Sequence, residues 1–150
     1  EQHYESSGAT GRMFANEDVG RSVESRCCSL ADVEDARQVA AKLGIEHKVI
    51  PCFNAFREHV LDKFVSEYAA GRTPNPCVDC NKHVKFGALF DRAKELGCEY
   101  LATGHYAQVT YDAAKKRWLL GRAVDNKKDQ SYMLYSLSQE QLAHVLFPFV

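Results

Sequence analysis

Residues 29–50, SLADVEDARQVAAKLGIEHKVI, predict a helix followed immediately by a strand. The Ser29 hydroxyl can cap the first helical turn, and Gly44 supplies a left-handed stop. Apolar side chains recur at helical spacing on one face of the helix: Leu30, Val33, Ala36, Ala40 and Leu43. The segment 45–50 then has the composition of a strand, which Pro51 ends. This helix–strand unit is typical of an α/β fold.

Further elements are predicted on both sides of this unit. They are a strand at 8–14, helices at 56–68 and 79–96, and a strand at 98–104. A hairpin of 106–111 with 117–121 follows, in which Tyr111 pairs with Trp118. A last helix begins at a Ser138–Gln141 capping box and stops before Pro148. The 56–68 helix has an apolar stripe of Phe56, Val60, Phe64 and Tyr68, widened by Leu61 and Val65. The alternation predicts a parallel sheet flanked by helices. Because ligands bind beyond the carboxyl ends of such strands, we expect the loop Gly104–His105–Tyr106 to face a ligand crevice.

Composition and charge narrow the class of protein. The 150-residue chain is 45% hydrophobic and carries a formal net charge of −1, which allows a packed core but gives no bulk attraction to nucleic acid. Contact with RNA therefore requires a local basic patch. No apolar run approaches the roughly 18 residues of a membrane span, and the first residues lack a secretory signal. The sequence begins with Glu rather than Met, so we expect the natural start to lie upstream.

Six cysteines stand at positions 27, 28, 52, 77, 80 and 98. A chain this long and this rich in Lys, Glu and Ala differs from small disulfide-bonded secreted proteins, so we expect a reducing, cytoplasmic compartment. Two of the cysteines form a CxxC pair within residues 73–86, TPNPCVDCNKHVKF. The pair has three interpretations: half of a zinc site, a redox dithiol, or a nucleophilic thiol. The other cysteines are interpreted as structural, and Cys98 as a core residue that opens a strand.

The nucleophile interpretation depends on the surroundings of Cys80. Zinc needs four ligands, and the adjacent pair Cys27–Cys28 is a poor complement; a thioredoxin-type dithiol normally follows a strand directly. Cys80 instead falls in the first turn of the predicted helix, where unpaired N–H groups and the helix dipole favour an anion. The neighbouring positive or basic side chains are Lys82, His83 and Lys85. The same groups would favour phosphate. For an isolated CxxC, two half-buried cysteines beside a solvated charged face are the simpler alternative.

Three segments resemble the tRNA-specific 2-thiouridylases, the MnmA family. They are GRTPNPCVDCNKHVKF (71–86), ATGHYA (102–107) and KDQSYMLYSLSQEQL (128–142). The resemblance implies an adenine-nucleotide α-hydrolase-like fold, Rossmann-like and of the PP-loop ATPase type, that is incomplete here. Residues 1–150 would form part of the catalytic nucleotide-binding domain, and the helical tRNA-binding region would begin near Asp125. The family's N-terminal pyrophosphate-binding loop and C-terminal domains have no counterpart, so we expect an internal fragment that is inactive and poorly soluble alone.

The resemblance also implies a reaction. In that family ATP, with Mg²⁺, adenylates the C2 carbonyl oxygen of the wobble uracil of tRNA. A persulfide sulfur, relayed from a cysteine desulfurase or a sulfur-relay protein, then attacks C2. Water competes with sulfur, so the site must be closed and the base extruded, which a single-stranded anticodon loop makes less costly. We therefore expect an ATP-dependent tRNA sulfurtransferase.

Matching the motifs residue by residue implies four groups of site residues. The catalytic nucleophile is Cys80. The residues that contact the target base are Asn75, Pro76 and Cys77. The residues that contact ATP are Gly104 and Phe14, the latter standing where family members commonly have Met. The residues that contact tRNA are His105, Lys128, Asp129 and Gln130.

The sulfur chemistry stays open because many family members have Asp where this chain has Cys77. Cys77, Cys80 and a cysteine outside this chain could hold a [4Fe–4S] cluster, whose open iron would deliver sulfide without a protein persulfide. The pair is also compatible with a dithiol that forms a disulfide bond. A non-catalytic metal- or RNA-binding module that uses Cys77 and Cys80 is the alternative from another class. A different adenylating enzyme of the same fold is a third hypothesis.

Overall fold

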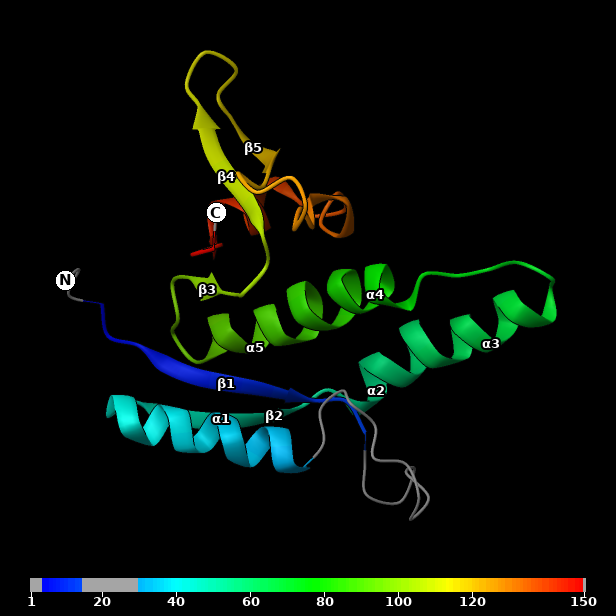
Figure 1. Cartoon of the computed structure of the whole chain (residues 1–150), viewed down its shortest axis with the longest axis horizontal. Helices are drawn as coiled ribbons and strands as arrows, with labels where there is room; N and C mark the ends of the chain where they lie inside the picture. The colour runs from blue at the N-terminus through cyan, green and yellow to red at the C-terminus, as the bar shows by residue number, and fades with distance from the viewer. Residues whose placement is uncertain (1–3, 15–29, 150) are drawn as a thin grey trace.

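The structure, a computed structural model, describes residues 4–14 and 30–149. Its first layer contains β1 (Ser7–Arg12), α1 (Leu30–Leu43) and β2 (Glu46–Pro51), with α1 lying along the two paired strands (Figure 1). The strands are parallel, and their register runs from Ser7 opposite Glu46 to Arg12 opposite Pro51. Gly44 ends α1 at φ 69°. The predicted α/β unit is confirmed, whereas Ser29, Cys27 and Cys28 lie outside the described residues.

The second predicted helix is continuous but not α-helical throughout. It consists of α2 (Phe53–Phe56), a π-helical segment Arg57–Leu61 and α3 (Asp62–Ala69). Val60 is buried, but Leu61, Val65 and Tyr68 are 38%, 66% and 55% exposed. Their assignment to the buried stripe was wrong, because a π turn adds a residue to the helical repeat and rotates all later positions by about 100°.

The third helix begins three residues earlier than predicted and carries the CxxC pair. It consists of α4 (Pro76–Asp79), a π-helical segment Cys80–Ala88 and α5 (Leu89–Glu95). Asn75 is the N-cap, with its side-chain oxygen accepting a hydrogen bond from Cys77 N at 3.1 Å, and Pro76 occupies the first helical position. Proline is tolerated there because it has no N–H to leave unpaired. Cys80 therefore lies one turn further along than predicted, and Cys77 occupies the first turn instead.

The strand predicted at 98–104 is shorter in the structure. Only Leu101–Ala102 forms β3, which pairs in parallel with β6 (Val145–Leu146). Cys98 is half-buried and precedes the strand, so the prediction that it opens a strand in the core was wrong. The reason is local: the Cys98 N–H donates to Ala93 O at 3.0 Å, which closes the end of α5 before the strand can start.

The carboxyl-terminal third contains the predicted hairpin and the capped helix. Strands β4 (Ala107–Asp112) and β5 (Arg117–Arg122) are antiparallel, with Tyr111 opposite Trp118 and their rings 5.3 Å apart. A 3₁₀ turn at Ser131–Met133 leads to α6 (Gln139–Ala143). Both hydrogen bonds of the Ser138–Gln141 capping box are present. The hairpin, the ring pair and the capping box are confirmed.

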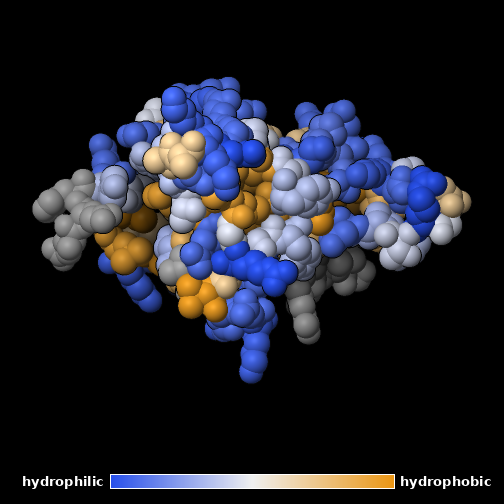
Figure 2. Space-filling model, turned by 90° about the horizontal axis from the view of Figure 1, so that it is seen from above, coloured by the Kyte–Doolittle hydropathy of each residue, from blue (hydrophilic) through white to orange (hydrophobic). Residues whose placement is uncertain are grey.

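The helix Pro76–Glu95 separates two apolar cores, as its central position in Figure 1 shows. The strand core contains Met13, Ile50, Cys52, Val60 and Val84. The hairpin core contains Phe86, Phe90, Ala107, Leu134, Val145 and Phe147. Figure 2 shows that hydrophilic residues cover most of the face on the hairpin side, with hydrophobic residues between them near its centre. Within the described part of the chain, no helix has the length and apolar character needed to cross a membrane.

Replacing Phe86 by Ala tests the position of the hairpin core. Phe86 is 0% exposed, so the substitution removes a ring from the core and leaves a cavity, and we expect the free energy of unfolding to fall by about 3–5 kcal/mol. The measurement is chemical denaturation of the intact protein. Val65→Ala, at the exposed position on α3, is the control and should change stability by less than about 0.5 kcal/mol. Equal losses in the two variants would show that the core is misplaced.

Candidate functional site

Cys80 lies at the carboxyl ends of the parallel strands β1 and β2. It is half-buried and packs on the strand core, together with Phe14, which follows β1, and with Ala55 and Phe56 of α2. The strands end at Arg12 and Pro51, which are paired in the register. Ligands of open α/β sheets bind at this edge. The structure thus brings Cys80 and Phe14, two residues far apart in the sequence, to the same end of the sheet.

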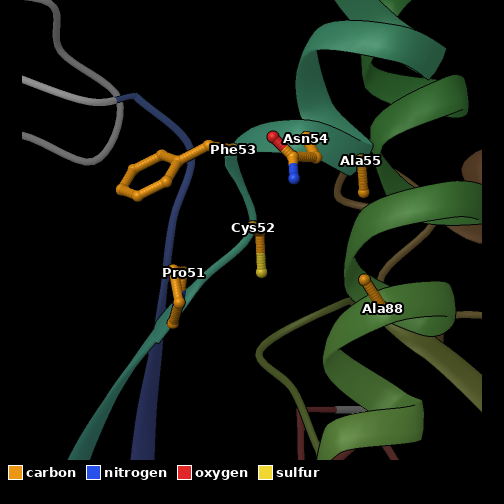
Figure 3. A pocket seen from close by; sticks show the side chains of 6 residues that line it. All are labelled: Pro51, Cys52, Phe53, Asn54, Ala55 and Ala88. Atoms are coloured by element: carbon orange, nitrogen blue, oxygen red, sulfur yellow. The ribbon is translucent and has the colours of Figure 1, made fainter. Parts of the chain in front are cut away.

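A shallow cavity of about 310 Å³ opens at this edge. Its lining residues are Pro51, Cys52, Phe53, Asn54, Ala55 and Ala88. In Figure 3 the buried Cys52 points into the space between the end of β2 and the helix that carries Ala88, and Phe53 points away from it. The Arg12 guanidinium lies 5.6 Å from the centre of the Phe53 ring. No sequence pattern indicated this cavity, because it forms only where α2 meets the third helix.

The turn before α4 exposes the residues predicted to contact the target base. Asn75 and Cys77 are exposed, and Pro76 is half-buried. The Asn75 side-chain oxygen already accepts a hydrogen bond from Cys77 N, so Asn75 stabilises the start of the helix as its N-cap. The cap and the two prolines fix the direction in which Cys77 projects. Contact of these residues with a base stays a prediction.

An ion pair holds the CxxC turn against α3. Lys63 Nζ donates to Asp79 Oδ1 at 2.7 Å, and Asp79 is 8% exposed. The hydrogen bond to Asp79 raises the pKa of Lys63, which keeps the ammonium charged beside the buried carboxylate. Because Asp79 directly precedes Cys80, the pair fixes the helix at the position of the candidate nucleophile. Sequence reasoning missed this contact.

One helical turn away, His59 and His83 stack with ring centres 4.4 Å apart. Burial lowers the pKa of His83, and nearby His59 and Lys82 lower it further. The sequence does contain a spacing that indicates a shared helix face for each of two pairs of residues. His59 and Lys63 are four residues apart on one helix, and Asp79 and His83 are four residues apart on the next. Nothing in the sequence indicated that these two faces meet.

His105 points into the hairpin core. It is 8% exposed, its ring centre lies 5.7 Å from that of Phe86 and 6.1 Å from that of Phe147, and its Nδ1 shares a 2.8 Å hydrogen bond with Thr103 Oγ1. Burial, followed by the positive charge of Lys85, lowers its pKa from 6.5 to about 4. Whether the loop faces a ligand crevice stays a prediction, but within the loop the His105 ring packs among apolar side chains while Gly104 is exposed. Its contact with tRNA stays a prediction.

Gly104, the predicted ATP contact, lies under an aromatic ring. A Cβ at this position would be 3.5 Å from the ring of Phe149, an ordinary contact distance, so the protein alone does not require glycine here. The Phe149 ring also stacks on Tyr106 at 5.8 Å. A need for glycine would therefore come from a ligand that approaches the backbone. Phe14, the other predicted ATP contact, is half-buried and lies edge-on to Phe56 at 5.0 Å.

The segment Lys128–Gln130 is tied to the loop that carries Gly104. Gln130 N donates to Tyr106 O at 2.9 Å, Gln130 Oε1 accepts from Tyr106 N at 3.2 Å, and Lys128 Nζ lies 5.2 Å from the centre of the Tyr106 ring. The Asp129 carboxylate accepts from Ala123 N at 2.8 Å, and this bond lowers its pKa. The structure thus brings two of the matched motifs together, while their contact with tRNA stays a prediction.

No cluster of three or more His, Cys, Asp or Glu residues able to hold a metal ion occurs in residues 4–14 and 30–149. Cys77 and Cys80 therefore do not complete a metal site with described residues. The complement considered for a zinc site, Cys27–Cys28, lies outside them. An iron–sulfur cluster at Cys77 and Cys80 would therefore need further ligands from elsewhere in the protein.

The described residues form a mixed α/β fold in which parallel strands are flanked by helices. The whole sequence, residues 1–150, matches the family described as tRNA methyl transferase HUP domain. The chain belongs to this family, which confirms the predicted fold class.

Many curated relatives carry the name tRNA-specific 2-thiouridylase MnmA. The chain is 48% identical over 148 residues to the one from Clostridioides difficile (strain 630), covering 99% of this chain and 41% of that protein. It is 50% identical over 152 residues to the Symbiobacterium thermophilum protein, covering 99% and 39%. It is 49% identical over 149 residues to the Acetivibrio thermocellus protein, covering 99% and 42%. The chain thus spans about two-fifths of the length of these relatives, and the predicted resemblance is confirmed.

The buried His105 predicts acid sensitivity. Its pKa is about 4 in the folded chain against an ordinary value of 6.5, so the unfolded chain binds the proton more readily between these values. Acid therefore favours unfolding, and stability is lost as the pH falls from 6.5 towards 4. We expect His105 to contribute a loss of about 2 kcal/mol between pH 7 and pH 5.

The measurement is the free energy of unfolding at both pH values for the intact protein and for His105→Gln. The variant should lose less stability between pH 7 and pH 5 than the wild type, because Gln does not titrate. The same loss in both proteins would contradict a buried, neutral imidazole.

Proposed function

We propose that this chain is part of the catalytic domain of a tRNA sulfurtransferase that replaces the C2 oxygen of a wobble uridine by sulfur at the expense of ATP. The observation that carries the proposal is the position of Cys80, half-buried at the carboxyl ends of β1 and β2 on a helix held by the Lys63–Asp79 pair. The names of the relatives support tRNA 2-thiolation as the reaction.

Two described residues are proposed to contact ATP. Phe14 supplies an apolar ring at the end of β1, and Gly104 supplies backbone without a Cβ beyond β3. Both follow strands, where nucleotides bind in such sheets. ATP, with Mg²⁺, would adenylate the C2 oxygen and so make it a leaving group. The part of the site that holds the phosphates is not assigned to described residues.

In the transfer step a sulfur–carbon bond forms at C2 and the bond to the adenylated oxygen breaks, so that AMP leaves with that oxygen. The attacking atom is the terminal sulfur of a persulfide, relayed by a cysteine desulfurase or a sulfur-relay protein and carried on a second cysteine. Its S–S bond breaks when the nucleophilic Cys80 thiolate attacks the carrier sulfur, so that a disulfide forms between the two cysteines and the transferred sulfur stays on C2. The exposed Asn75–Cys77 turn is proposed to contact the extruded base. The [4Fe–4S] alternative would require further ligands besides Cys77 and Cys80.

The anticodon loop of tRNA is the proposed partner, and its binding region begins near Asp125. Lys128 is exposed, and it lies beside Tyr106 through its contact with that ring. A cation next to an aromatic ring suits an unpaired nucleotide, which offers both phosphate charge and a base to stack. Thiol chemistry of this kind is proposed to take place in the reducing cytoplasm.

Replacing Cys80 by Ser in the intact protein tests the proposal. Serine keeps the shape of the side chain but is a far weaker nucleophile, so we expect formation of 2-thiouridine to fall by a factor on the order of 10³ or more. The measurement is mass spectrometry of nucleosides from tRNA incubated with ATP and a sulfur donor. Cys98→Ser, half-buried after α5, is the control and should keep wild-type activity. Activity retained in Cys80→Ser would reject this role.

A further inference from the structure

Asn81, the residue after Cys80, carries a buried hydrogen-bond acceptor with no partner. The residue is 2% exposed, and in the part of the chain that the structure describes its Oδ1 makes no hydrogen bond. Leaving a buried acceptor unpaired costs stability, and most buried polar atoms in proteins are paired for this reason. An unpaired atom beside a candidate nucleophile therefore needs an explanation.

Two polar side chains that contact the same helix, Asp79 and Gln141, are paired. Asp79, two positions earlier, bonds Lys63 at 2.7 Å. The Gln141 amide donates to Phe86 O and accepts from Ser138 N. The structure satisfies these groups on either side and leaves the Asn81 oxygen alone.

Asn81 lies on the side of the helix that faces the Gly104–His105 loop. In the π-helical segment Cys80–Ala88, positions four and five residues apart are neighbours on one face, so Asn81 precedes Lys85 and Phe86 by one turn. The Phe86 ring is 5.7 Å from that of His105, and Lys85 is close enough to affect the His105 charge. Figure 1 shows this helix beneath the connection between β3 and β4. Helical spacing thus puts Asn81 next to Cys80 on the face that also carries Lys85 and Phe86.

We propose that Asn81 Oδ1 accepts a hydrogen bond from the N3–H group of the target uracil when the base binds, before its C2 oxygen is adenylated. This inference rests on the proposed function and adds a residue that selects the base. In uracil N3–H is bonded to C2, the carbon that reacts, and so an acceptor next to Cys80 is suitably placed. Cytosine presents an unprotonated N3 instead. A buried site built for one hydrogen-bond pattern discriminates strongly, because water cannot repair a mismatch. Because Asn81 is covered in the structure, the proposal requires the residues over it to move when the base enters.

The Asn81→Leu variant tests whether the Asn81 side-chain oxygen is free to bind a ligand or is needed for the stability of the folded protein. Leucine has nearly the same shape, and it removes an unpaired polar atom from the interior. We expect the urea midpoint of the intact protein without tRNA to be unchanged or higher. Gln141→Leu, which removes an amide with two partners, is the matched control and should lower the midpoint. A lower midpoint for Asn81→Leu would show that its oxygen is paired within the protein and would overturn the proposal.

Binding then tests the base. The dissociation constant is measured for tRNA anticodon stem-loops with uridine or cytidine at the target position, without ATP or a sulfur donor. The wild type should bind the uridine stem-loop more tightly than the cytidine one. In Asn81→Leu the ratio of the two dissociation constants should fall by about tenfold. An equal preference in both proteins, or none in the wild type, would overturn the inference. Failure of the proposed function is distinguishable, because it would appear as wild-type protein that makes no 2-thiouridine.

Discussion

The helix from Pro76 to Glu95 is the constraint on which the rest of the structure depends. Val84 on one side belongs to the strand core, and Phe86 and Phe90 on the other side belong to the hairpin core. Burial of these side chains is the main stabilising term for both halves. Because one rigid element serves both cores, the angle at which Cys80 projects is fixed relative to the strands and to the Gly104–His105 loop. The site is assembled as a consequence of core packing.

The start of that helix is fixed separately. The Asn75 cap sets the first turn, and the Lys63–Asp79 pair fastens it to α3. A partly exposed ion pair alone contributes little, but here the carboxylate is buried, so losing Lys63 would leave a charge without its partner. Capping and pairing together hold Cys77 and Cys80 in a defined geometry before any ligand binds, which is what group transfer requires.

Sequence reasoning located the elements whose signals are local. The Gly44 stop, the Ser138 capping box and the Tyr111–Trp118 pair each depend on a few neighbouring residues. Sequence reasoning failed where contacts between segments distant in the sequence determine which side chains are buried. The π-helical segment Arg57–Leu61 shifts the helical phase, so the exposure of Val65 was misjudged. The position of Cys80 was misjudged for a local reason, because the Asn75 cap and Pro76 start the helix three residues earlier than predicted. The burial of His105 and the orphan oxygen of Asn81 depend on contacts between elements far apart in sequence.

The central claim is that Cys80 reacts at the base held between the strand ends and the Gly104–His105 loop. The most direct measurement is a structure of the intact protein with tRNA and a non-hydrolysable ATP analogue. The account predicts the Cys80 sulfur within about 3.5 Å of the atoms that react, with the base extruded towards Asn81. A base bound elsewhere, with the Cys80 thiol still covered by the strand core, would contradict it.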